Sequence, residues 1–370
     1  SSDVCSSDLV IKKMTGKNVP AVDILVPTRN EPRFVIEQTL ITLLNIDYAN
    51  KQVCLIDGSD NEKTINANRY LCKKYGAKYF KQPRDVGAKA GGINDYAQTA
   101  DAKYFLVLDA DQNPMPDILK KLVGIAEADP KIAFVQTPQY YSNTDVSPIA
   151  LAAAMQQSVF FEVVCEAKNL VNAAFCCGTN VLINRRLLLA VGGFDEKSVT
   201  EDFATSLEWH SLGYRSVYYN NVKVFGMAPE SLPAYLKQQH RWAAGTFGVL
   251  RRVVKKFFQK PTSLTLGQWW EYFLSSSYYF VGWSFFFLMM CPIIFLLFDQ
   301  PIYFMSFKVY AVAFFPYYIL SMVVFFSTMK KRHYGAKQLF NGMIMNSLNF
   351  PVLMKATLSG LLNIKTKFVV

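Results

Sequence analysis

The sequence predicts an α/β domain with a mostly parallel sheet, followed by membrane helices. From about residue 21, short β-rich runs alternate with amphipathic helical patterns, which is typical of a parallel sheet covered by helices on both faces. Two long runs near the C-terminal end carry almost no charge, as bilayer spans do. With 51% hydrophobic and 15% aromatic residues among 370, the chain is more apolar than one soluble domain requires.

Five short runs rich in β-branched and aromatic residues are the expected strands of the sheet. They cover residues 22–26, 53–56, 78–81, 104–108 and 132–136. Polar clusters follow three of them, at 28–31, 57–60 and 109–111. Because ligands bind beyond the carboxyl ends of strands in such sheets, we expect the active site at that edge.

The part of the chain after Pro148 is expected to form a floor that faces the membrane. It reads as a long helix at 148–171, a turn at 177–180, a short strand, and a helix that opens near Thr200.

The C-terminal third predicts two transmembrane helices, at about 273–298 and about 309–328. An apolar stretch at about 335–363 is interrupted by Asn and Pro residues, so it predicts an interfacial helix. Basic residues flank the spans on one side, with only Lys308 near the connection, which predicts a cytoplasmic N-terminal part: Arg251, Arg252, Lys255, Lys256, Lys260, Lys330, Lys331, Arg332, Lys337.

The net charge of +11 is concentrated beside these spans, so we interpret it as attraction to lipid and diphosphate rather than to nucleic acid. Residues 1–9 are rich in Ser and Asp and fit neither a signal peptide nor a strand. We therefore divide the chain into a non-native or disordered leader (1–20), an α/β domain (21–250) and a membrane region (251–370).

Asp109 and Asp111 end a continuous apolar strand with a spacing that aims both carboxylates to one side. Two hard oxygen ligands so placed suit Mg²⁺ or Mn²⁺ bridging a diphosphate. A polar strand end with a helix cap is the alternative for this motif alone.

Two further clusters are weaker when taken singly. Asp57 can accept hydrogen bonds from a base or ribose, but Asp-Gly is also a turn sequence. Lys89 begins a Gly-rich segment, 89–94, that offers a cation and backbone amides to a diphosphate, and a plain turn is the alternative.

Two helical motifs complete the candidates. Thr200, Glu201 and Asp202 open an amphipathic helix, where Asp202 is either a general base or a cap. Gln238, Arg241 and Trp242 share one helix face, which suits a phosphate and a sugar ring, or an interfacial helix.

Taken in this order, Asp57, Asp109-Ala110-Asp111, Thr200-Glu201-Asp202 and Gln238-x-x-Arg241-Trp242 resemble the D, DxD, TED, QxxRW pattern of processive family-2 glycosyltransferases of the cellulose synthase type. Residues 26–31, 89–94 and 175–179 also match that branch, and the similarity runs from about residue 22 onward. The final Phe368-Val369-Val370 resembles the start of the family's gating loop. Ile56 stands where many relatives have a first Asp, and Gly92 replaces a frequent Asn.

The resemblance implies a Rossmann-like GT-A domain and assigns roles by position. The donor nucleotide would be bound by Thr28, Glu31, Asp57, Lys89, Asp109, Gln238 and Arg241. Asp109 and Asp111 would hold the metal, and Asp202, with Glu201 beside it, would be catalytic. The acceptor would be bound by Phe175, Cys177, Gly178, Thr179 and Trp242.

The implied function is transfer of a hexose from a nucleotide sugar, UDP-glucose first, to the non-reducing end of a growing β-glucan. The alternatives are a non-processive hexosyltransferase that acts on a lipid carrier and a synthase of another β-polysaccharide, such as curdlan, chitin or hyaluronan. The expected setting is the plasma (inner) membrane, crossed several times, with a cytoplasmic catalytic domain and accessory export subunits. No nucleic-acid partner is expected.

Overall fold

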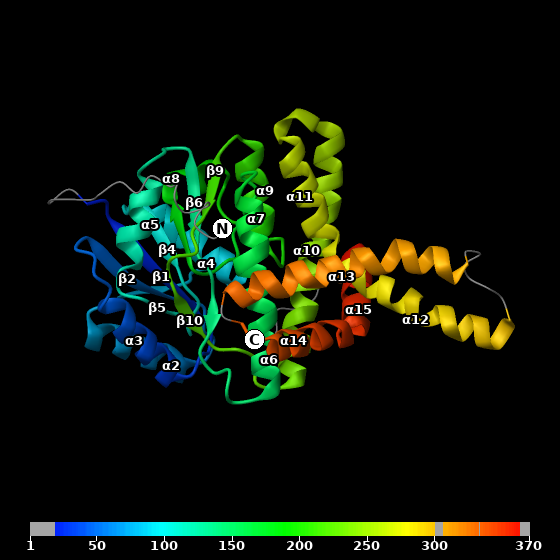
Figure 1. Ribbon diagram of the computed structural model, residues 1–370. Helices are drawn as coiled ribbons and strands as arrows, with labels where there is room; N and C mark the ends of the chain where they lie inside the picture. The colour runs from blue at the N-terminus through cyan, green and yellow to red at the C-terminus, as the bar shows by residue number, and fades with distance from the viewer. Residues whose placement is uncertain (1–18, 300–305, 333, 363–370) are drawn as a thin grey trace.

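The computed structural model describes residues 19–299, 306–332 and 334–362. A seven-stranded sheet in the order β3-β2-β1-β4-β8-β6-β9 forms its centre (Figure 1). The strands are β1 (Val22–Thr28), β2 (Lys51–Asp57), β3 (Lys78–Lys81), β4 (Tyr104–Val107), β6 (Ile132–Gln136), β8 (Val181–Asn184) and β9 (Arg215–Tyr218).

The five predicted strands are present, and four of the six strand pairs of the sheet are parallel: β1 with β2 and β4, β2 with β3, and β6 with β9. The exception is β8, which runs antiparallel between β4 and β6. The sheet is therefore mixed, and its reversed member β8 is the short strand predicted after the turn at 177–180.

Helices cover both faces of the sheet, as predicted. One face packs Ile36, Leu71 and Leu122 against β1 and β2 residues such as Ile24 and Leu55. These come from α2 (Arg33–Leu44), α3 (Glu62–Tyr75) and α5 (Ile118–Ala126). The opposite face is covered by α4 (Ala88–Thr99), α8 (Arg185–Ala190) and α9 (Glu201–Ser211), with Trp209 fully buried.

A second, small sheet was not predicted. It joins β5 (Asn113–Pro114), β10 (Val224–Gly226) and β7 (Tyr140–Tyr141) in the order β5-β10-β7. Strands of two or three residues are too short to show a period-two pattern in the sequence. This small sheet brings the segment after Asp111 beside the segment before α10.

The predicted helix at 148–171 is α6 (Pro148–Val159), a π-helix η1 (Phe160–Cys165) and α7 (Glu166–Asn169) in direct succession. It begins where Ser147 caps it by accepting a hydrogen bond from the Ala150 amide at 3.0 Å, with Pro148 in the first turn.

The helices that follow lead into the membrane region. They are α10 (Leu232–Gln259), η2 (Pro261–Ser263), α11 (Leu266–Ser277), η3 (Tyr278–Phe280), α12 (Val281–Phe298) and α13 (Phe307–Lys331). The predicted domain boundary after residue 250 falls inside α10, which is one uninterrupted helix.

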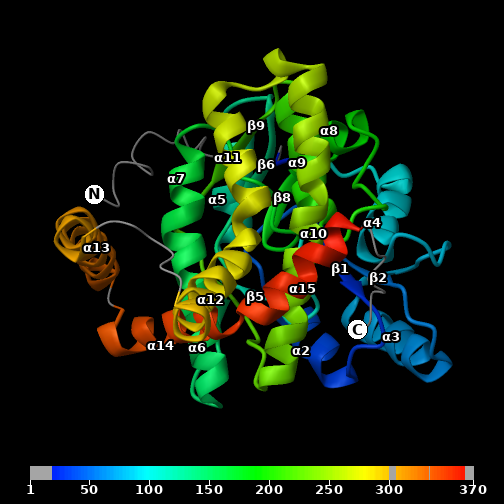
Figure 2. The same cartoon turned by 90° about the vertical axis from the view of Figure 1, so that its right-hand side faces the viewer.

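Three helical segments of the described chain are long and apolar enough to cross a membrane: Pro148–Asn169, Leu266–Phe298 and Phe307–Lys331. The last two contain both predicted spans. They differ from the first in burial, because half of its apolar window is buried inside the protein, against 6% and 0% of theirs. Figure 1 shows α12 and α13 projecting away from the sheet, and Figure 2 views both almost along their axes, well separated.

The single interfacial helix predicted at about 335–363 is instead two helices, α14 (Ala336–Leu348) and α15 (Phe350–Leu361). The break occurs at Asn349, and Pro351 occupies the first turn of α15, where its missing N–H costs no hydrogen bond. α14 packs on α6, and α15 packs on α10 and α12. The predicted leader, apart from residues 19 and 20, and the ending at 368–370 lie outside the described residues.

Candidate active site

The ends of β1 and β2 meet at the predicted edge, where Thr28 pairs with Asp57. Asp57 is fully buried, and it accepts hydrogen bonds from the Ser59 amide at 2.8 Å and from the Tyr79 hydroxyl at 2.9 Å. Thr28 is also buried, and its hydroxyl has no hydrogen-bond partner among the described residues. Thr28 thus keeps an unused polar group at this edge, whereas Asp57 organises the turn that follows it.

Lys89 lies in the first turn of α4, two residues after the N-cap Gly87 with its left-handed φ of +75°. A Cβ at Gly91 would lie 2.0 Å from the Val86 carbonyl oxygen, so only glycine allows this tight entry into the helix. The entry directs the Lys89 ammonium onto the Asp109 carboxylate, with which it forms an ion pair.

Burial by itself would lower the pKa of Lys89, but the nearby carboxylates of Asp109, Glu201 and Asp202 outweigh it and raise that pKa. Lys89 is therefore cationic at neutral pH. It lies within electrostatic reach of two predicted motifs, DxD and TED, that are about a hundred positions apart in the chain.

Asp109 and Asp111 are held from behind by backbone amides and hydroxyls. The Asp109 amide donates to the Thr179 hydroxyl at 2.9 Å, and Asp111 accepts from the Met227 amide at 3.0 Å. Burial, with the charge of Asp109, raises the pKa of Asp111. Burial and the charges of Asp111 and Asp109 likewise raise the pKa of Glu31.

The raised pKa values of Asp111 and Glu31 beside the Asp109 charge indicate a site short of positive charge. Within residues 19–299, 306–332 and 334–362, no group of three or more His, Cys, Asp or Glu side chains is arranged to enclose a metal. Asp109 and Asp111 offer hard oxygen ligands, so they fit a divalent cation whose remaining ligands come from a diphosphate and water.

Asp202 lies in the first turn of α9 and faces the turn that contains Gly178. A Cβ added at Gly178 would lie 2.9 Å from Asp202 Oδ2, and Gly178 has a φ of +80°. Asp202 Oδ1 accepts a hydrogen bond from the Phe203 amide at 2.7 Å. Thr200, the N-cap residue, makes no side-chain cap hydrogen bond. Asp202 thus serves one free amide of the first turn through Oδ1, while its Oδ2 lies toward the Gly178 turn, and its role as base remains a prediction.

Burial raises the pKa of Asp202, and the charge of Asp109 adds to this effect. Burial and the charge of Asp202 raise the pKa of Glu201. The two adjacent carboxyls therefore compete for one proton, and a base with a pKa nearer neutrality is better matched to proton abstraction from a hydroxyl.

The predicted acceptor segment, 175–179, is held by buried amide side chains that sequence reasoning missed. Gln136 accepts from the Cys177 amide at 2.8 Å and donates to the Thr179 carbonyl at 2.8 Å. Asn180 donates to Gln112 at 3.2 Å. Gln112 and Gln136 follow the apolar runs of β4 and β6, and this position at strand ends is the signal that was available.

Of the predicted acceptor residues, Thr179 is buried, with its hydroxyl committed to Asp109, and Phe175 packs on Phe203 with ring centroids 4.9 Å apart. Gly178 faces Asp202, whereas the Cys177 thiol packs beside Cys165 and donates to the Phe175 carbonyl. The acceptor roles of all four remain predictions.

α10 brings Gln238, Arg241 and Trp242 beside the TED turn. A Cβ at Gly245, one turn further on, would lie 2.5 Å from the Thr200 methyl group, so glycine permits the close contact of α10 with that turn. Gln238 lies within hydrogen-bonding reach of the Tyr141 hydroxyl, which also feels the charges of Asp111, Asp109 and Arg241. Arg241 is exposed and Trp242 half-buried.

The structure therefore brings Glu31, Lys89, Asp109, Asp111, Glu201, Asp202 and the α10 motif to one edge of the sheet, with Thr28 and Asp57 at the neighbouring strand ends. The sequence profile of the family described as Glycosyltransferase like family 2 matches residues 20–245. The chain belongs to this family. The Cellulose synthase profile also matches, over residues 190–336.

Among curated proteins, this glycosyltransferase chain is 31% identical over 239 residues to the UDP-forming cellulose synthase catalytic subunit of Pseudomonas fluorescens (strain SBW25), which covers 63% of the chain and 32% of that protein. It is 28% identical over 290 residues to the cellulose synthase 1 catalytic subunit of Komagataeibacter xylinus, covering 76% and 38%. The chain thus spans about a third of the length of these relatives.

Among solved structures, a mannosyltransferase of Pyrobaculum calidifontis in complex with GDP-Man and Mn²⁺ superposes with a TM-score of 0.67. The two sequences are 16% identical, and the superposed region covers 97% of this chain and 91% of the mannosyltransferase chain. This likeness shows the glycosyltransferase fold.

Proposed function

We propose that this chain is the catalytic part of a membrane-bound inverting glycosyltransferase that extends a β-glucan from UDP-glucose. The observation that supports this most is the position of Asp202. The charges of Lys89 and Asp109 both act on its carboxyl group, and its Oδ2 faces Gly178. A base on one side and charges for a diphosphate on the other are the two requirements of sugar transfer.

In this proposal, Asp202 takes the proton of the acceptor hydroxyl as that oxygen attacks the anomeric carbon. The bond from the sugar to the diphosphate breaks in the same step, so an α-linked donor gives a β-linked product. Lys89 and the exposed Arg241 meet the charge of the departing nucleoside diphosphate.

Asp109 and Asp111 would hold Mg²⁺ or Mn²⁺, which supplies positive charge opposite the leaving group. The unused hydroxyl of Thr28 and the enclosed carboxylate of Asp57 would take part in binding the nucleotide. The acceptor would lie beside Phe175, Cys177 and Trp242.

We place the protein in the plasma (inner) membrane, with α12 and α13 as spans and the catalytic domain on the cytoplasmic side. The basic residues flanking the spans support this orientation. α11 adds an outward apolar stripe at i, i+4 and i+8, formed by Leu266, Trp270 and Leu274, while its opposite face is buried. Such a stripe next to a span suits the lipid interface, and accessory export subunits would complete the assembly.

The test is incorporation of radiolabelled sugar by the purified chain in lipid nanodiscs. UDP-glucose, UDP-N-acetylglucosamine and GDP-mannose are supplied singly with Mg²⁺ or Mn²⁺, and products are sized and digested with linkage-specific glycosidases. We expect a β-glucan from UDP-glucose and no product with EDTA. A single sugar on a lipid-extractable carrier would refute processive synthesis, and incorporation of N-acetylglucosamine instead would refute the donor assignment.

A further inference from the structure

The last turn of α13 is fixed to the catalytic domain by one arginine and two glutamates. Arg332 Nη1 donates to Glu162 Oε2 at 3.2 Å, and Nη2 donates to Glu166 Oε2 at 2.6 Å. The exposed fractions of the three side chains are 17%, 12% and 14%. These ion pairs are largely shielded from water, so loss of one partner is costly because it leaves the other charge unpaired.

Both carboxylates also accept hydrogen bonds from other side chains. Glu162 also accepts from the Tyr140 hydroxyl at 3.1 Å and from the Tyr334 hydroxyl at 2.6 Å. Glu166 accepts from the Asn220 amide group. Tyr140 belongs to the small sheet beside the DxD segment, and its neighbour Tyr141 faces Gln238.

Glu162 lies within the π-helix η1, a conformation that is rare and often associated with functional sites. Two aromatic rings of this π-helix pack on neighbouring elements, one on the acceptor segment and one on β9. The ring centroid of Phe160 lies 6.0 Å from that of Phe175, and Phe161 stacks on Tyr218 at 6.5 Å.

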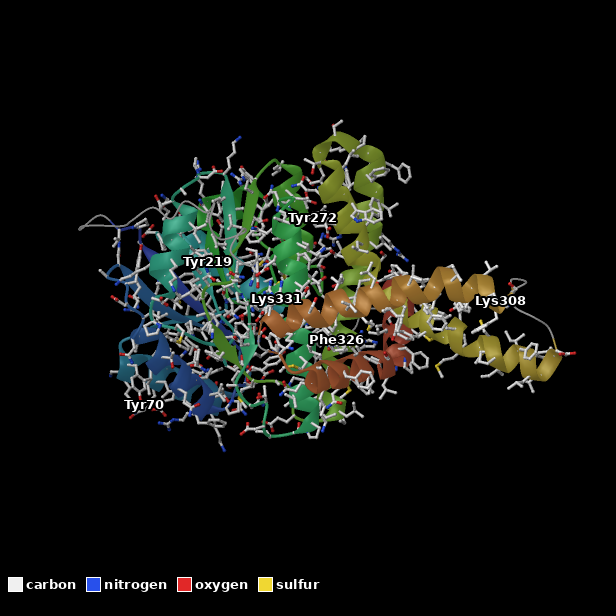
Figure 3. The ribbon with its side chains drawn as sticks, in the orientation of Figure 1. Tyr70, Tyr219, Tyr272, Lys308, Phe326 and Lys331 are labelled. Carbon is white, nitrogen blue, oxygen red and sulfur yellow. The ribbon has the colours of Figure 1, made fainter. Side chains whose placement is uncertain are left out.

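The contacts continue from Phe175 to the proposed base. Phe175 packs edge-on against Phe203 at 4.9 Å, and the Phe203 amide donates to Asp202 at 2.7 Å. The π-helix, three packed rings and one backbone hydrogen bond therefore connect the end of α13 to Asp202. Figure 3 shows Lys331 and Phe326 at the end of α13 beside the domain, whereas Lys308 lies at its far end.

We propose that Arg332 is a positioning residue that sets the acceptor side of the active site through Glu162 and the π-helix. This inference rests on the proposed function, because it concerns the alignment of an acceptor with Asp202. Arg332 and α13 contact neither Lys89 nor the DxD residues in any described hydrogen bond or ion pair, so the donor side should not depend on it.

The experiment compares Arg332→Gln with Lys331→Gln in the full chain in nanodiscs. Lys331 is the adjacent cation on the same turn and is exposed, so it is the matched control. We expect Arg332→Gln to lower kcat for transfer on the order of 10- to 100-fold, as small misplacements of reacting groups do. The donor KM should stay within about twofold, and hydrolysis of the donor by water should rise relative to transfer.

Arg332→Lys keeps the charge but cannot fork across two carboxylates, so its kcat should fall between that of the wild type and that of Arg332→Gln. A role in anchoring alone would lower the amount of folded enzyme and leave the hydrolysis-to-transfer ratio unchanged. That result, or equal kcat values for Arg332→Gln and Lys331→Gln, would overturn the inference.

Hydrogen exchange tests the geometry without any turnover. Arg332→Gln should speed exchange in residues 156–178 and leave β1 to β4 unchanged, whereas Lys331→Gln should change neither. Unchanged exchange at 156–178 also overturns the inference. If the wild type makes no polymer, the proposed function is refuted. If the two variants still differ in hydrogen exchange as expected, the structural contact between Arg332 and residues 156–178 is established independently of that function.

Discussion

The donor side and the catalytic side of this site are held by different kinds of structure. Thr28, Asp57 and the DxD pair follow parallel strands and are fixed by the sheet. Asp202 lies instead on α9, which contacts α10, and α10 packs on the membrane-region helix α15. The donor site is thus built on the ends of strands, whereas the position of the base depends on helices that pack against the membrane region. Changes on the donor side should therefore act mainly on donor binding, and changes on the catalytic side mainly on kcat.

The largest effect should come from Asp202→Asn, which keeps the size of the side chain but removes the base. We expect kcat to fall about 10²- to 10⁴-fold, the usual range for loss of general base catalysis. The Kd for the nucleoside diphosphate should stay within about twofold, because no donor-side contact changes. Isothermal titration in nanodiscs and labelled-sugar incorporation measure the two quantities.

Retention of transfer by Asp202→Asn would remove Asp202 from the base role. A parallel loss of nucleotide affinity would show that the two sides are not separable. Asp109→Asn is the matched variant, since it should weaken binding of the metal-loaded nucleotide as well as turnover.

Most of the sheet was predictable because its strands are short β-rich runs, and 78–81 and 132–136 were located to the residue. The edge strand β9, with the sequence Arg-Ser-Val-Tyr, was missed. The reversed direction of β8 was not predictable, since its three apolar residues, 181–183, would look the same in a strand of either direction. The split of 335–363 could have been read from Asn349 and Pro351, a stop followed by a helix start.

The charged residues of the site were predictable because they follow strands or begin helices and together match the family's motif pattern. The residues that hold them were missed, since only its place at the end of an apolar run distinguishes a buried amide such as Gln136 from a surface polar residue in sequence. Tyr79 was missed for the same reason. Its hydroxyl matters only because the parallel pairing of β2 and β3 places it beside Asp57.

Gly178→Ala should sharpen the contrast on the catalytic side. Gly178 and Gly213 both have a left-handed φ, +80° and +77°, so each substitution to Ala costs about 1–2 kcal/mol of backbone strain. Only at Gly178 would the new methyl group meet Asp202, since nothing lies within 4 Å at Gly213. We expect kcat to fall on the order of 10- to 100-fold for Gly178→Ala and to stay near wild type for Gly213→Ala. Equal kcat values for the two variants would contradict the placement of Asp202.

The pH profile should report the raised pKa of Asp202. The base is active when ionised, so kcat/KM should fall about tenfold per pH unit below that pKa, and the fall should begin at a higher pH than for an ordinary aspartate. Lys89 favours the ionised form, so Lys89→Met should move the acid limb to higher pH. An acid limb near pH 4 that Lys89→Met leaves in place would contradict this assignment.

The smallest effect should come from Tyr79→Phe on the donor side. It removes one of the two protein donors to the fully buried Asp57, which should lower the free energy of unfolding by about 1–3 kcal/mol. Because Asp57 pairs with Thr28 at the end of the sheet, the donor KM should rise a few-fold while kcat stays near wild type. Tyr70→Phe is the control, since that ring is exposed on α3. A fall in kcat at constant KM would place Asp57 on the catalytic side. It would then be wrong that residues on strand ends bind the donor while residues on helices carry out the reaction.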